Sequence, residues 1–214
     1  MGGRPVIEYL LQRMQAAEPD EIRLVTRPEK VDLVRYARRR RMRVIEEHPR
    51  TLSASILSGT RDLAGDDVIL LGFPDSIWEP VTGFIRLLEV VHAGVDAALG
   101  LFRMSEPERS DVVETTPDGQ VRAIHVRPEK PRTNRVWGCA ALRARVLDAL
   151  SEDVPVGTLL GDVAGTGGVR GVDLSDLYLD IGTRTGLEEA RRRLAEHSSS
   201  GLGGRPSSHS TLVP

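Results

Sequence analysis

The run Val68-Ile69-Leu70-Leu71 is short and wholly apolar, and the turn-forming residues Gly72 and Pro74 end it. Such a run, bounded by polar residues, is typical of a buried strand in a parallel sheet. Asp75 follows at the carboxyl end of that strand, the edge of an open α/β sheet at which ligands bind. The stretch therefore predicts either a carboxylate that holds Mg²⁺ and nucleotide phosphates or a cap of the next helix.

A second carboxylate follows a similar segment late in the chain. Asp180 comes directly after Leu177-Tyr178-Leu179 and precedes the turn-former Gly182. Two carboxylates at adjacent strand ends can bind one Mg²⁺ without other protein ligands, because this ion keeps waters and takes substrate phosphates. We therefore predict Asp75 and Asp180 as metal ligands, although the spacing alone does not show that they meet.

Strand and helix patterns alternate through the first half of the chain. Apolar residues at helical spacing predict helices over 5–17, 28–40 and 52–63, and short apolar runs predict strands over 22–26, 42–46 and 67–71. This alternation predicts an α/β, Rossmann-like fold with a mostly parallel sheet and helices on both faces.

The second half is expected to add a helix over 78–93, a strand over 96–103 and a hairpin over 112–126. A strand over 135–142 with a helix to Leu150, a short strand pair through Leu174 and Leu177, and a helix over 185–196 complete the expectation. We assign 1–197 to a single domain. Residues 198–214 are rich in Ser, Gly, His and Pro with little to bury, and are predicted to be a disordered tail.

Composition narrows the class of protein. The 214 residues carry a formal net charge of −2, which argues against a nucleic-acid binder that relies on a wide positive field. Cys139 is the only cysteine, so the sequence offers no intrachain disulfide, and we expect a reducing, cytoplasmic location. The sequence shows neither a bilayer-spanning apolar run nor a signal-peptide pattern, and we expect no membrane partner.

Several local features have ordinary structural explanations. The run Arg38–Arg43 is expected to be a solvated helix end, where cations complement the helix dipole, rather than a nucleic-acid site. Gly165-Thr166-Gly167-Gly168 lacks the Lys-Ser/Thr of a P-loop, which favours a plain turn. Cys139 lies in an apolar run and is expected to be a core residue rather than a nucleophile.

The segment Arg127-Pro128-Glu129-Lys130-Pro131 follows a predicted strand and, with Arg132, gathers three cations. Such a group can neutralise a phosphate at the edge of the sheet. An exposed proline-rich loop explains the same residues equally well.

Four segments in order resemble the sugar-1-phosphate nucleotidyltransferases, in particular the glucose-1-phosphate thymidylyltransferase type. Gly3–Leu11 looks like the opening of that family's first long helix, and Leu70–Glu79 looks like its metal-aspartate strand end. Val112–Pro128 looks like its "VVE…KP" hairpin, and Leu179–Thr183 looks like its "W-x-D-x-G-T" motif. The resemblance extends from Gly3 to about Arg193.

The resemblance implies Mg²⁺-assisted transfer of a nucleotidyl group from a nucleoside triphosphate, with dTTP favoured, to a sugar 1-phosphate, which releases pyrophosphate. Asp75 and Asp180 would hold the metal. The family's phosphate-contacting lysine falls on Arg127 by distance or on Lys130 by chemistry, and the two are not distinguished. The implied substrate-binding positions are Thr51, Leu52, Asp111, Glu114, Trp137 and Gly138.

The chain also departs from the family pattern. The family begins with a strand and a "GGxGTRL" loop, and this sequence starts after the position of that loop, so the central first strand is expected to be missing. Three explanations stay open: a start upstream of Met1, a truncated remnant without catalysis, or a non-catalytic nucleotide- or sugar-phosphate-binding protein whose missing strand comes from another chain. The oligomeric state is left open, a homo-oligomer included.

Overall fold

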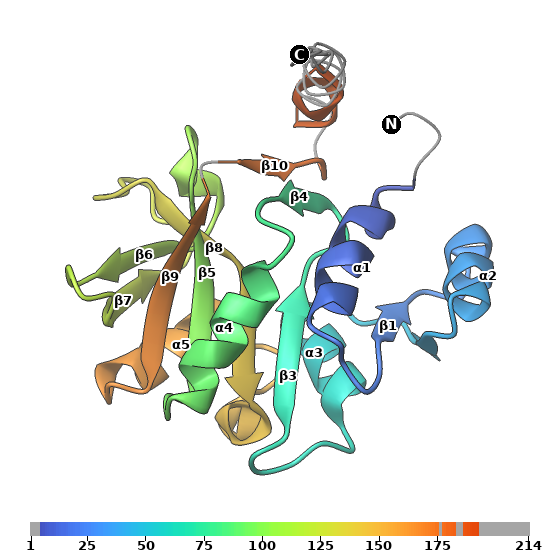
Figure 1. Cartoon of the computed structure of the whole chain (residues 1–214), viewed down its shortest axis with the longest axis horizontal. Helices are drawn as coiled ribbons and strands as arrows, with labels where there is room; N and C mark the ends of the chain where they lie inside the picture. The colour runs from blue at the N-terminus through green and yellow to red at the C-terminus, as the bar shows by residue number, and fades with distance from the viewer. Residues whose placement is uncertain (1–4, 176, 183–185, 193–214) are drawn as a thin grey trace, which may run out of the picture.

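The computed structural model describes residues 5–175, 177–182 and 186–192 (Figure 1). Within these residues the named α-helices are α1 (Ile7–Ala16), α2 (Val31–Arg39), α3 (Leu52–Thr60), α4 (Gly83–His92) and α5 (Val156–Gly165), with 3₁₀ turns η1 (Pro107–Arg109) and η2 (Ala144–Ala149). The strands are β1 (Arg23–Thr26), β2 (Arg43–Glu46), β3 (Val68–Gly72), β4 (Ser76–Trp78), β5 (Ala97–Arg103), β6 (Val112–Thr115), β7 (Val121–His125), β8 (Arg135–Arg143), β9 (Val169–Ser175) and β10 (Tyr178–Asp180). Residues 186–192 are also helical.

The first half follows the predicted alternation of helices and strands. β1 and β2 pair in parallel as a two-stranded sheet, and α2 connects them. The helical spacing of α1 gives it two apolar sides. Ile7 and Leu11 pack with Leu24 of β1, whereas Leu10 packs in the cluster that contains Trp78. α1 therefore joins the β1–β2 sheet to the rest of the molecule.

The larger sheet has six strands in the order β7-β6-β8-β5-β9, and β3 also pairs with β8. The α/β class is confirmed, but the expected predominance of parallel pairing is wrong. Among the described strands only β1–β2 and β5–β9 pair in parallel. The reason is that the chain returns from the β6–β7 hairpin through β8, which runs antiparallel between β3 and β5 and separates them.

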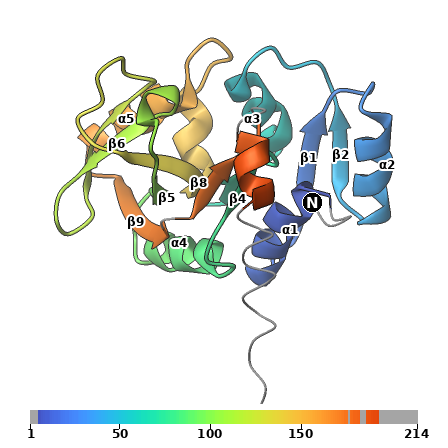
Figure 2. The ribbon, with the colours of Figure 1, turned by 90° about the horizontal axis from the view of Figure 1, so that it is seen from above.

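Helices cover both faces of this sheet, because successive residues of β5 point to opposite sides. Leu99 and Leu101 lie in a core cluster with Leu160 of α5. Ala98 and Phe102 lie in a second cluster with the apolar side of α4. Figures 1 and 2 show α4 and α5 on opposite sides of β5 and β9.

The predicted helix over 78–93 begins too early. Ser76–Trp78 form β4, which pairs antiparallel with β10, and α4 starts at Gly83. The helix cannot include these residues because their backbone groups pair with β10. Pro80, which lies between β4 and α4, also disfavours a continuous helix. This correction matters for function, since β4 begins directly after Asp75.

Two further elements differ from the sequence prediction. The expected helix before Leu150 is the 3₁₀ turn η2. α5 was not predicted, because Gly157, Gly161 and Gly165 lower its helix propensity. The structure explains the first of these glycines: a β-carbon at Gly157 would lie 2.2 Å from a carboxylate oxygen of Asp111.

The predicted tail 198–214 lies outside the described residues. None of the described helices combines the length and the hydrophobicity that crossing a lipid bilayer requires.

Candidate functional site

The structure brings Asp75 and Asp180 together. β4 and β10 pair with Ser76 opposite Asp180, and the backbone N–H of Ile181 donates to the backbone carbonyl of Asp75 at 2.9 Å. A β-carbon at Gly182 would lie 3.1 Å from Oδ2 of Asp75 and 3.1 Å from Oδ1 of Asp180. The two carboxylates thus face the same space, which a side chain at position 182 would fill.

The carboxylates of Asp75 and Asp180 place two negative charges next to this space. Burial raises the pKa of Asp75 above its ordinary value, and the negative charge of Asp180 raises it further. Within the described part of the chain, neither carboxylate forms an ion pair with an Arg, Lys or His. The described residues contain no group of three or more His, Cys, Asp or Glu suited to a metal, so a cation here would have two carboxylates from the protein.

Burial of Asp75, together with the nearby charge of Asp180, predicts a pH-dependent stability. Because the pKa of Asp75 is raised on folding, the folded protein binds more protons than the unfolded chain between the ordinary and the raised pKa. The free energy of unfolding should therefore fall as the pH rises through that window, and ionised Asp75 should destabilise the fold at neutral pH. We expect Asp75→Asn to raise the melting temperature at pH 7 in the absence of divalent cations, measured by circular dichroism.

Asp62 provides the matched control for this measurement. Hydrogen bonds from Arg23 and Arg43 lower the pKa of its carboxylate to about 2. The stability from this interaction is present at pH values above the ordinary pKa and is lost as the pH falls toward 2. Asp62→Asn should therefore lower the melting temperature at pH 7, by a small amount because the pair is exposed. Equal shifts in the same direction for both variants would contradict the assignment.

A second group of predicted residues lies around Asp111. The indole N–H of Trp137 donates to Oδ2 of Asp111 at 3.3 Å, and the backbone N–H of Arg127 also donates to this carboxylate. Burial raises the pKa of Asp111, and the interactions with Trp137 and Arg127 oppose that rise. Arg127 has a φ of 41°, a backbone conformation that few residues other than glycine adopt. The structure thus places three predicted residues in direct contact.

Aromatic packing links this second group to Asp75. The ring of Trp137 lies 5.5 Å, centre to centre, from that of Phe73, two residues before Asp75. The next residue, Gly138, lies against Tyr178 of β10, since a β-carbon there would come within 2.2 Å of the ring. The ends of β3 and β10 and the start of β8 therefore form one continuous edge.

The other predicted residues have separate roles. Thr51 caps α3, where its Oγ1 accepts from Ala54 and donates to the carbonyl of Glu152. Glu114 contacts His125 at 3.1 Å. Leu52 and Lys130 are exposed. Among the described residues, the structure shows no hydrogen bond or ion pair from these four residues to either aspartate.

Cys139 is a core residue, as predicted. Its side chain is buried, and burial raises the pKa of the thiol. Gly167 has a φ of 84° in the turn between α5 and β9, so the predicted turn there is confirmed.

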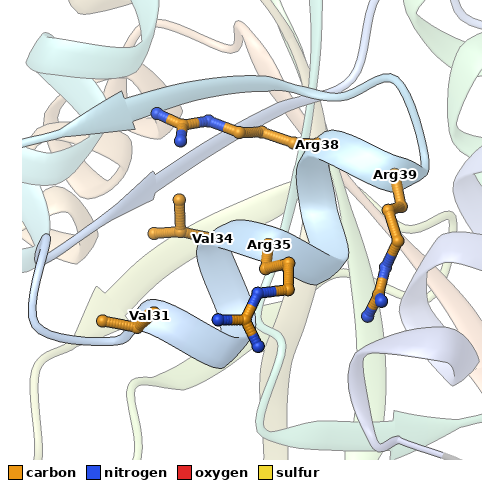
Figure 3. Close-up of a pocket in the computed structure, with 5 residues that line it drawn as sticks. All are labelled: Val31, Val34, Arg35, Arg38 and Arg39. Atoms are coloured by element: carbon orange, nitrogen blue, oxygen red, sulfur yellow. The ribbon is translucent and has the colours of Figure 1, made fainter.

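The arginine run lies away from these aspartates, on and after α2 at the edge of the molecule (Figure 1). Arg38 and Arg39 occupy the last turn of α2, as expected for cations that complement the helix dipole. With Arg35, Val31 and Val34 they line a shallow pocket of about 410 Å³ (Figure 3). Arg38 and Arg43 are paired with Glu46 and Asp62.

Sequence reasoning missed Ser76 and Gly182. Ser76 is buried and hydrogen-bonded to the hydroxyl of Tyr178, whose pKa is raised by burial and by the charge of Asp180. The sequence indicates Gly182 as a turn-former and as the glycine of the segment that resembles "W-x-D-x-G-T", but it does not show that the missing side chain leaves the space between the carboxylates open. The position of Ser76 directly after Asp75 is a sequence signal for a residue near the site. Its contact with Tyr178 follows only from the pairing of β4 with β10.

Solved structures share this fold. A UDP-glucose pyrophosphorylase in complex with UDP-glucose matches with a TM-score of 0.78 at 16% identity, over 91% of this chain and 88% of its own. A Bacillus anthracis protein described as a glucose-1-phosphate thymidylyltransferase, in complex with sucrose, matches with a TM-score of 0.76 at 15% identity, over 88% and 82%. No family model and no curated protein matches the sequence. At these identities the likeness establishes the Rossmann-like α/β fold.

Proposed function

We propose that this site transfers a nucleotidyl group from a nucleoside triphosphate to a sugar 1-phosphate. The observation that carries the proposal is the convergence of Asp75 and Asp180, far apart in sequence, on one space at the edge of the sheet. The names of the two solved structures support the same class of reaction, because both describe enzymes of sugar nucleotides.

The carboxylate pair fits Mg²⁺. Two facing carboxylates without a described cation partner, one with a raised pKa, are a donor set that a hard divalent ion would neutralise. Asp75 and Asp180 would hold it, and when bound it would offset the charge of the transferring phosphoryl group. Gly182 keeps the space between them open.

In the reaction, a phosphate oxygen of the sugar 1-phosphate forms a bond to the α-phosphorus of the triphosphate. The bond from the α-phosphorus to the bridging oxygen breaks, and pyrophosphate leaves with that electron pair. The guanidinium of Arg127, or the ammonium of Lys130, would bind phosphate oxygens. Asp111, held by Trp137, would accept hydrogen bonds from a sugar hydroxyl. We further propose a thymidine nucleotide, with dTTP as the donor, in line with the resemblance of the sequence.

The test is pyrophosphate release by the purified chain with glucose 1-phosphate, Mg²⁺ and, in turn, dTTP, UTP, ATP, GTP and CTP. We expect release that requires all three components and is fastest with dTTP. Calorimetric binding of a triphosphate without pyrophosphate release would overturn the proposal in favour of a binding protein. Faster release with another nucleotide would overturn only the choice of dTTP.

A further inference from the structure

A cavity of about 600 Å³ lies between β1 and β3. Both strands line it, through Arg23–Val25 on one side and Val68–Gly72 on the other. Among the described strands, β1 pairs only with β2 and β3 pairs only with β8. We call this space the strand slot, because each of its two long walls is a strand with one edge already paired.

The unpaired edges of both strands face the slot. The carbonyls of Ile22 and Thr26 accept from β2 and its extension, so the backbone groups of Arg23 and Val25 point the other way. On β3, the carbonyl of Asp67 accepts from the backbone N–H of Ala144 at 2.8 Å. This bond shows which residues of β3 direct their backbone groups toward β8, because successive residues of a strand direct them to opposite edges. Residues 67, 69 and 71 bond toward β8, and the backbone groups of residues 68, 70 and 72 point into the slot.

Helices close the slot on its two faces. Met14 and Ala17 of the α1 region line it on one face, and Ile56 and Gly59 of α3 line it on the other. Figure 2 shows α1 and α3 on opposite sides of the molecule next to β1. An occupant therefore meets mainly apolar walls above and below, with Ser55 and Thr60 of α3 among them, and rows of backbone donors and acceptors at both sides.

We propose that the slot binds one extended, apolar strand of a partner polypeptide. Only an extended backbone offers donors and acceptors at strand spacing along both of its edges. Its side chains must be apolar on both faces, as in any strand covered by helices on both sides. The slot wall also carries four carboxylates and one cation, Arg23, which is itself paired with Glu21 and Asp62, so the strand should be flanked by a basic residue. The carboxylates are Glu18, Asp20, Glu21 and Asp67. This inference does not depend on the reaction proposed above, since its test measures binding and hydrogen exchange.

The test uses the full 214-residue chain and a fluorescein-labelled synthetic peptide with the sequence Lys-Ala-Val-Ile-Leu-Ala-Val-Lys. We expect saturable binding by fluorescence anisotropy. At a peptide concentration about 100 times the dissociation constant, hydrogen exchange at the amides of Val25 and Leu70 should slow by roughly 100-fold. Exchange in β7, which lies at the far edge of the larger sheet, should not change.

A chemically matched peptide separates strand pairing from apolar binding. N-methylation of alternate residues removes the donors toward one edge and keeps the side chains, and should weaken binding at least about tenfold. Equal binding of the methylated peptide would overturn the proposal in favour of a simple apolar pocket. Ser55→Trp, which places a large side chain in the slot, should also abolish binding, whereas Val31→Trp on the exposed side of α2 should not.

The remaining outcomes concern the source of the strand. Failure of the unmodified peptide to bind or to protect β1 and β3 would overturn the proposal. A dimer in solution whose interface protects these amides would identify a second copy of the chain instead. If the protein from its own cells has a larger intact mass and its own additional residues protect the amides of Val25 and Leu70, the strand belongs to the same polypeptide and the assignment to a partner is overturned.

Discussion

Asparagine at position 75 or 180 is expected to remove Mg²⁺-dependent pyrophosphate release, with a loss of roughly 100-fold or more in turnover. Each substitution keeps the size of the side chain but removes one of the two charges that face the space beside Gly182. Calorimetry should show a parallel loss of Mg²⁺-dependent triphosphate binding, which tests the metal site independently of catalysis.

Asp62→Asn is the control for these two variants. It removes a carboxylate that lies on the surface in ion pairs with Arg23 and Arg43, and it should leave Mg²⁺-dependent binding unchanged. If Asp75→Asn and Asp180→Asn both turn over or bind as the unmodified protein does, the two aspartates do not hold the metal. If only one of the two variants loses turnover and Mg²⁺-dependent binding, only that aspartate holds the metal.

Trp78→Ala should give the largest loss of stability, about 3–5 kcal/mol in the free energy of unfolding. The indole is fully buried, with ring centres 5.4 Å from Phe84 and 5.6 Å from Phe102. The guanidinium of Arg13, itself almost completely buried, lies 5.2 Å from the indole centre. Urea unfolding at equilibrium, followed by circular dichroism, measures the loss.

Trp78→Phe separates the contribution of ring packing to stability from the contribution of the indole N–H. In the described structure the Nε1–H of Trp78 is buried without a hydrogen-bond partner, so its removal should cost nothing in hydrogen bonding. Phenylalanine should therefore retain much of the stability that alanine loses. A loss below about 1 kcal/mol for the alanine variant would contradict the packing described here.

The elements of the first half could be predicted because each has a strong local signal. The strand before Asp75 is a continuous apolar run, and α1 has Ile7, Leu10 and Leu11 at helical spacing. Local signals of this kind depend on a few neighbouring residues, so a single sequence contains them.

The remaining features depend on contacts between distant segments. The pairing of β4 with β10 converts a predicted helix start into a strand and brings Asp180 beside Asp75. The insertion of β8 between β3 and β5 decides the direction of the sheet. Neither pairing has a signature in the strands themselves. The choice between Arg127 and Lys130 was also open, and the structure shows only that Arg127 contacts Asp111.

The β1–β2 sheet shares no strand pairing with the larger sheet among the described residues, and this has a consequence for how the molecule opens. The small core around Leu11, Leu24 and Ala37 is separate from the two cores of the larger sheet. Segments that share a core and a hydrogen-bond ladder open together, whereas segments with a separate core and no shared ladder open with their own, lower free energy. Residues 23–46 therefore form a cooperative unit that can unfold while the sheet around β8 remains native.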